Sequence, residues 1–158
     1  MNIQNSEHAQ KAMALFKEGY NCSQSVFLAF EDVHHMDREI AARLASSFGG
    51  GLGRMREVCG AVSGMAMVAG LLLGYDSPTD YEGKTEHYAR IQELAGKFTE
   101  ANGSIVCKEL LGLEQKGDSH VPEKRTEEYY QKRPCGEMVG IAAAILEEYL
   151  NQSSVNCS

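Results

Sequence analysis

Residues 49–64 read GGGLGRMREVCGAVSG, and this stretch joins a glycine-rich segment and two arginines to a cysteine that opens an apolar run. The run covers residues 58–73 and is apolar nearly all round, so it predicts a helix at the centre of the protein. Gly60, Gly64 and Gly70 would each weaken a helix by about 1 kcal/mol relative to alanine, which indicates that another backbone approaches this helix closely. We therefore expect the rest of the chain to pack around residues 58–73.

Helical periodicity with matching cap residues extends over almost the whole chain. Before the glycine-rich segment, Ser6, Asn21 and Asp37 are suitable N-caps for three helices. After it, the pattern predicts a long helix over 80–101, a short helix over 105–111 capped by Ser104, a short helix or turn over 127–133 and a final helix over 135–150. No strand pattern or internal repeat is evident, so the whole chain is predicted to be an all-α, single-domain helical bundle around a central small-residue-rich apolar helix. We expect an ordered core over about 6–150 and a polar tail over 151–158.

Length and charge restrict the class of protein. The chain has 158 residues, enough for one domain with a buried core. Its formal charge of -7 argues against a nucleic-acid partner, which would require a basic surface. The N-terminus lacks the features of a secretory signal, and the longest apolar stretch, 61–73, is shorter than the roughly 20 residues that cross a bilayer. We therefore expect a cytoplasmic protein without membrane insertion, in which the cysteines are not structural disulfides.

Four of the five cysteines fall where helices are predicted to begin. These helix-start cysteines are Cys22, Cys59, Cys107 and Cys135. First turns present unpaired N–H groups and the positive end of the helix dipole, which stabilise a thiolate and lower its pKa. Basic residues lie beside three of the four, namely Arg54, Arg56, Lys108 and Arg133. If the helix starts converge, they would form a pocket for a four-thiolate iron–sulfur cluster or a reactive dithiol pair. The spacings contain no CxxC, so they do not choose between these two sites.

The segment CGAVSG, Cys59–Gly64, matches the CGAxxG motif of a family of redox-active proteins known by the cysteine pattern C_GCAxxG_C_C. One cysteine precedes the motif and two follow it, as in that pattern, and the contexts YNCSQ (20–24) and FGGGLGR (48–54) are also similar to the family. The resemblance covers roughly residues 9–150. It implies a redox role, and a further similarity to the non-haem domain of split-Soret cytochromes c implies a cysteine-bound iron–sulfur centre in a dimer. The chain has no CxxCH, so covalent haem attachment is not implied.

Two functional hypotheses follow. In the first, all four helix-start cysteines bind an iron–sulfur cluster, with [2Fe–2S] favoured, and pass electrons to a redox partner protein; aerobic purification could strip the cluster or leave zinc. In the second, the protein is a thiol–disulfide oxidoreductase with Cys59 as the attacking thiolate and another cysteine resolving the intermediate. A structural zinc–thiolate site is a related alternative. Cys157 is additional to the family pattern and receives no role.

The glycine-rich segment allows a third interpretation. Gly51 and Gly53, with Arg54, could bring backbone N–H groups and positive charge to an anion or cofactor. No strand precedes the segment, and neither a Walker lysine nor a Rossmann spacing is present. A flexible connector that lets the central helix pack closely is therefore the stronger interpretation. Finally, the small-residue surface of the central helix predicts pairing with the same helix of a second subunit, and hence a homodimer.

Overall fold

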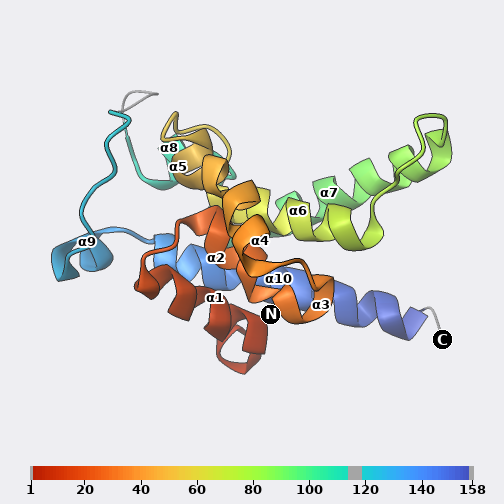
Figure 1. Ribbon diagram of the computed structural model, residues 1–158, viewed down its shortest axis with the longest axis horizontal. Coiled ribbons are helices and arrows are strands. Elements are labelled where there is room, and N and C mark those ends of the chain that lie inside the picture. The colour runs from red at the N-terminus through yellow and green to blue at the C-terminus, as the bar shows by residue number, and fades with distance from the viewer. Residues whose placement is uncertain (1, 114–118, 157–158) are drawn as a thin grey trace.

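The first helices begin at the N-caps that the sequence predicts. In the computed structural model, which describes residues 2–113 and 119–156, α1 covers Glu7–Glu18 after the short 3-10 turn η1, Ile3–Asn5. The Ser6 hydroxyl accepts the backbone N–H of Ala9, and Gly19 ends α1 in the left-handed conformation. The apolar face of α1 packs along α10 and α2 (Figure 1).

Helix α2, Cys22–Ala29, is the most enclosed element of the fold. Asn21 and Gln24 form a reciprocal capping box at its start, because each side chain accepts a backbone N–H of the other residue. Helices α1, α4, α6 and α10 all contact α2. Its core-forming side chains include Val26, Phe27 and Leu28, none more than 1% exposed. The chain then continues through α3, Glu31–His34, α4, Arg38–Ala45 with Asp37 as its predicted N-cap, and the 3-10 turn η2, Ser46–Phe48.

Helix α6, Gly60–Leu73, lies between α2, α7 and α10, in the central position predicted for it. The expected close backbone approach is present at two of its glycines. A Cβ atom on Gly64 would lie 2.7 Å from the carbonyl oxygen of Ser23, and one on Gly60 would lie 2.8 Å from the carbonyl oxygen of Phe48. The expectation is wrong for Gly70, where the nearest atom would be a side-chain nitrogen of His87 at 3.8 Å. Since Gly60 and Gly64 face α2 within one chain, a second subunit would have to contact another surface.

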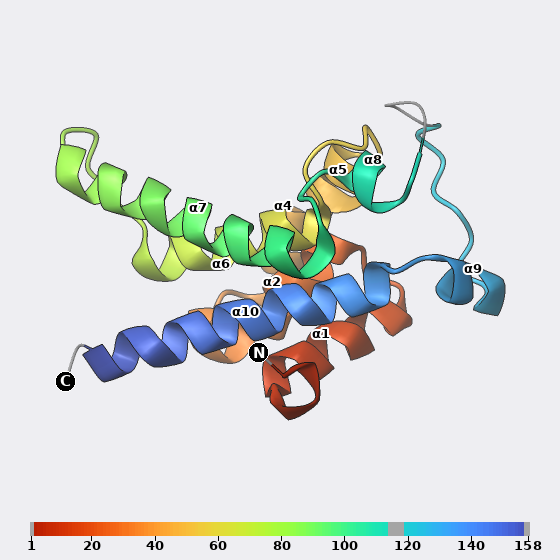
Figure 2. The ribbon, with the colours of Figure 1, turned by 180° about the vertical axis from the view of Figure 1, so that it is seen from behind.

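Helix α7, Tyr81–Asn102, runs back along α6 from the Asp80 N-cap to the left-handed Gly103. The C-terminal end of α6 and the first part of α7 extend away from the rest of the fold, and the C-terminal part of α10 extends in the same direction (Figure 2). Arg90 of α7 connects α6 with α10, because its guanidinium donates to the carbonyl oxygen of Leu73 and to the hydroxyl of Tyr149. These projecting parts of α6, α7 and α10 lie at the opposite end of the molecule from the four helix-start cysteines.

The last helix, α10, covers Cys135–Asn156, so the chain is helical for six residues beyond the predicted end of its core at residue 150. Residues 151–153, Asn-Gln-Ser, contain no glycine or proline that would stop a helix. Cys157 lies outside the described residues. Among the helices that the structure describes, none combines the length and apolar character needed to cross a membrane.

Two short helices, α8, Cys107–Leu110, and α9, Glu127–Lys132, complete the cysteine end of the fold. Ser104 was predicted to cap α8, but Val106 occupies the N-cap position. The Ser104 hydroxyl instead accepts the N–H of Val106, two residues after it. The all-α prediction is confirmed, and in the described part of the chain the backbone pairs in β fashion only at a single bridge between Val58 and Val106.

Alanine substitutions at two helical glycines should have opposite effects. Gly64→Ala should lower the free energy of unfolding by about 1–3 kcal/mol, because its Cβ would overlap the Ser23 carbonyl oxygen. Gly96→Ala in α7 is the matched control, since a Cβ there would meet nothing within 4 Å. It should stabilise the protein by about 0.5–1 kcal/mol through helix propensity. Urea denaturation measures both, and a neutral or stabilising Gly64→Ala would contradict the close packing of α2 on α6.

Candidate functional site

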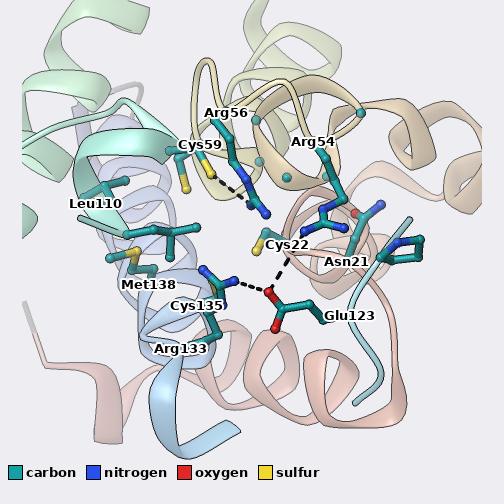
Figure 3. Close-up of a pocket in the computed structure, with 18 of the residues that line it drawn as sticks. Asn21, Cys22, Arg54, Arg56, Cys59, Leu110, Glu123, Arg133, Cys135 and Met138 are labelled. Carbon is teal, nitrogen blue, oxygen red and sulfur yellow. Dashed lines mark hydrogen bonds and ion pairs between the residues drawn. The ribbon is translucent and has the colours of Figure 1, made fainter. Parts of the chain in front are cut away.

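The four helix-start cysteines line one cavity of about 270 Å³, which we call the cysteine cavity. Cys22, Cys107 and Cys135 are the first residues of α2, α8 and α10, and Cys59 is the N-cap of α6. Figure 3 shows three of their labelled side chains around the same space. Cys59 and Cys107 are buried, Cys22 and Cys135 are half-buried, and all four are free thiols. The predicted convergence of four helix starts is therefore present.

A short backbone bridge holds Cys59 and Cys107 together. The N–H of Cys59 donates to the carbonyl of Ile105 at 2.7 Å, and the N–H of Cys107 donates to the carbonyl of Glu57 at 2.6 Å. These bonds flank the antiparallel pairing of Val58 with Val106. Two residues that are 48 positions apart in sequence are thus fixed next to each other by main-chain hydrogen bonds. Neither segment carries an alternating strand pattern, so this contact could not be predicted from the sequence.

The glycine-rich segment forms an ordered left-handed turn rather than a flexible connector. Residues 50–54 all have positive φ angles, between 56° and 69°, in and just after the short element α5, Gly49–Leu52. Two of them, Leu52 and Arg54, are not glycine, and each such residue costs about 1 kcal/mol or more. A strained conformation of this kind persists only where the surrounding structure enforces it.

The turn makes space for a cysteine. A Cβ atom on Gly51 would lie 2.7 Å from the Cβ of Cys107 and 2.6 Å from the backbone nitrogen of Glu57. Gly51, Gly53 and Arg54 all line the cysteine cavity, as expected of a site segment. The N–H of Gly53, however, donates to the carbonyl of Ser47. This bond already uses one of the N–H groups that would be needed to bind an anion or cofactor at the glycine-rich segment.

Positive charge surrounds the thiols. Four arginines line the cavity: Arg54, Arg56, Arg125 and Arg133. Arg56 is only 5% exposed, and its Nη1 donates to the Cys107 sulfur at 3.7 Å. Lys108, which was also expected near the site, does not line the cavity.

Arg125 was not singled out from the sequence, because it lies in a polar segment without periodicity. Its guanidinium donates to the carbonyl oxygens of Phe16 and Tyr20 at the end of α1. It also stacks on the rings of Phe16 and Tyr129, with centroid distances of 4.2 Å and 4.9 Å. Arg125 therefore anchors the segment before α9 over the cavity.

Burial opposes the helix dipole at most of the thiols. It raises the pKa of Cys59 to about 12, although the backbone N–H groups of Ala61 and Val62 act in the opposite direction. Burial also raises the pKa of Cys107 against the effect of Arg56. The expectation that a first-turn position lowers the thiol pKa is therefore wrong for these two cysteines. Removing a thiolate from water costs more than a helix terminus returns.

Cys22 and Cys135 behave as a pair. A hydrogen bond from the Cys22 thiol lowers the pKa of Cys135 to about 7, and Arg133 and Arg125 act in the same direction. The same bond, together with burial, raises the pKa of Cys22 well above its ordinary value. Among the four thiols, Cys135 is thus the one that carries a substantial thiolate fraction at neutral pH.

The cavity offers four sulfur donors, but in the described residues no group of three or more cysteine, histidine, aspartate or glutamate side chains is arranged as a ready metal site. The donor set itself matches iron–sulfur chemistry, in which four cysteine thiolates hold the cluster. The arginines would balance the negative charge of such a centre. The residues present therefore fit the cluster by donor type and charge.

The chain matches a protein-family model over most of its length. The sequence model described as "Putative redox-active protein (C_GCAxxG_C_C)" matches residues 20–149, a range that contains all four helix-start cysteines. No curated protein and no solved structure matches the chain.

Alkylation should single out Cys135. At low concentration, iodoacetamide should modify this residue first, and the rate should rise with pH and level off above a midpoint near 7, because only the thiolate reacts. Cys22→Ala removes the hydrogen bond to the Cys135 sulfur and should move the midpoint upward. Cys59→Ala should leave it near 7. Mass spectrometry of the labelled peptides measures each rate, and equal, slow labelling of all four cysteines would contradict the pairing of Cys22 with Cys135.

Proposed function

The chain belongs to the C_GCAxxG_C_C family, and from this premise we propose that it is a redox protein in which Cys22, Cys59, Cys107 and Cys135 form one electron-transfer site. The observation that carries the proposal is the meeting of four thiols, from the starts of four separate helices, in one arginine-lined cavity. A packing role alone would not require four cysteines to share a cavity that keeps about 270 Å³ of space among them.

We further propose that the four cysteines hold an iron–sulfur cluster, with [2Fe–2S] favoured. Such a cluster supplies one-electron transfer, and its potential depends on charge, hydrogen bonds to sulfur and exposure. The protein would contribute Arg56 as a hydrogen-bond donor beside Cys107 and the burial of Cys59 and Cys107. The proposal includes a partner protein that exchanges electrons at this site, and assembly of the chain as a homodimer.

Anaerobic purification tests the cluster. Protein prepared and kept without oxygen should carry about two iron atoms and two labile sulfides per chain if the centre is [2Fe–2S]. Alanine at any one of the four helix-start cysteines should remove most of the iron. Cys157→Ala is the matched control and should retain the full amount, because this residue is outside the four-cysteine set.

The metal content of the purified protein distinguishes an iron–sulfur cluster from a zinc site and from a site that binds no metal. Zinc without labile sulfide would identify a structural thiolate site instead of an electron-transfer centre. Anaerobic protein with neither metal, which also cannot be reconstituted with iron and sulfide, would refute metal binding by this cavity.

A second candidate function is thiol–disulfide exchange, and the pairing of Cys22 with Cys135 favours it. Cys59 was the attacking thiol expected from the sequence, but a pKa of about 12 leaves it protonated at neutral pH. Cys135 would therefore attack a partner disulfide, and Cys22 would resolve the mixed disulfide. In this step the two protein thiols lose two electrons and two protons as their S–S bond forms, and the partner disulfide becomes two thiols.

Oxidation by a small disulfide tests this second function. In metal-free protein, oxidised glutathione should produce a Cys22–Cys135 disulfide in preference to any other pair, as read by peptide mapping. Cys22→Ala should instead trap a mixed disulfide on Cys135, because the resolving thiol is gone. Preferential linkage of Cys59 to Cys107, or a random mixture of pairs, would exclude the Cys22–Cys135 couple as the working dithiol.

A further inference from the structure

An ion-pair cluster lies beside the thiols, at the edge of the cysteine cavity. One carboxylate oxygen of Glu123 faces two guanidinium groups: it lies 4.0 Å from Nη2 of Arg54 and forms an ion pair with Nη2 of Arg133 (Figure 3). The two arginine side chains are 14% and 18% exposed, whereas Glu123 is 45% exposed. The cationic half of the cluster is therefore built into the protein, and the anionic half is the part that reaches water.

We propose that Arg54 and Arg133 form a binding site for the carboxylate or tetrahedral oxyanion group of a small ligand, and that the Glu123 carboxylate occupies this site until the ligand replaces it. The inference goes beyond the redox function, and its test uses metal-free protein, because a bound cluster would share the same cavity.

The position of each arginine is fixed by the fold. Arg54 is the last residue of the left-handed turn, and Arg133 is the C-cap of α9, two residues before Cys135. The two come from segments 79 positions apart in the sequence, yet they face the same carboxylate oxygen. Preformed pairs of guanidinium groups suit anions that can accept several N–H bonds at once, which carboxylates and tetrahedral oxyanions do.

Glu123 is held less firmly than its partners. It lies two residues before Arg125, whose hydrogen bonds to Phe16 and Tyr20 anchor this segment to α1. The Glu123 side chain itself is partly in water, and ion pairs at exposed positions contribute little to stability. Largely buried guanidinium groups, in contrast, strongly favour a bound anion over none. An external anion can thus exchange with the internal one at small cost.

The charge and size of the cavity limit the ligand. Among the described residues, four arginines and one carboxylate, that of Glu123, line the cavity, in a chain whose formal charge is -7. This local reversal of charge favours anions over cations. A volume of about 270 Å³ lies near the lower end of the range for small-ligand pockets, which fits a small anion.

Glu123→Gln tests the site by removing the internal carboxylate while keeping the side-chain shape. Isothermal titration calorimetry at constant ionic strength with sulfate, phosphate and acetate should show at least about fivefold tighter binding to this variant than to the unmodified protein. Tighter binding of sulfate and phosphate would identify a tetrahedral oxyanion as the ligand group, and tighter binding of acetate would identify a carboxylate.

Glu128→Gln is the matched control. It removes the same charge from an exposed ion pair with Lys132 on α9 and should leave anion affinity unchanged. Adding Arg133→Gln to Glu123→Gln should abolish the increase in anion affinity that Glu123→Gln produces. A thermal melt provides a second readout: Glu123→Gln should unfold at a lower temperature than the unmodified protein, and the best-binding anion should restore the difference. Equal anion affinity of the two single variants, or retention of the gain without Arg133, would overturn the proposal.

Discussion

The contact between α2 and α6 sets the geometry on which the rest of the structure depends. Gly60 and Gly64 have no side chains, so the backbone of α6 lies directly against Ser23 at the start of α2. A Cβ on Gly60 would also come within 3.2 Å of the Cβ of Cys22. The same small residues that allow the core to close therefore bring Cys22 beside the start of α6, where Cys59 is the N-cap. Core packing and the candidate site share one constraint.

Burial outweighs helix position at Cys59 and Cys107, and the hydrogen bond between Cys22 and Cys135 has the largest effect on the other two thiols. The rise in the Cys59 pKa from 9.0 to about 12 corresponds to about 4 kcal/mol, whereas a helix dipole typically contributes about 0.3–1 kcal/mol. Cys135 differs because it accepts a hydrogen bond from Cys22 and lies near Arg133. Four cysteines in the same kind of helical position thus have different chemistry. Cys135, which accepts this hydrogen bond beside two arginines, forms the thiolate, and the buried Cys59 stays neutral.

The arginines have separate tasks in this arrangement. Arg56 is buried against Cys107, Arg125 joins the segment before α9 to α1, and Arg54 and Arg133 share the carboxylate of Glu123. An acidic protein can hold these cations in one place because each guanidinium faces a sulfur, a carboxylate or carbonyl oxygens. The left-handed turn contributes to this, since it fixes Arg54 at a positive φ angle that only a tightly enforced backbone maintains.

The sequence by itself determined the helices and the location of four cysteines at helix starts. Caps such as Ser6, Asn21 and Asp37 act through side-chain bonds to backbone groups three residues away, so local spacing is enough to locate them. The family motif around Cys59 likewise needs only neighbouring residues. The glycines of α6 correctly indicated a close helix contact, although the sequence could not say which of them made it.

Only the tertiary structure decided which groups meet. The bridge between Val58 and Val106, the pairing of Cys22 with Cys135 and the sharing of Glu123 all join residues dozens of positions apart. Such contacts depend on the path of the chain in space, and periodicity and spacing carry no information about that path. Thiol pKa values depend on burial for the same reason, so the distinction between Cys59 and Cys135 arises only when the chain is folded.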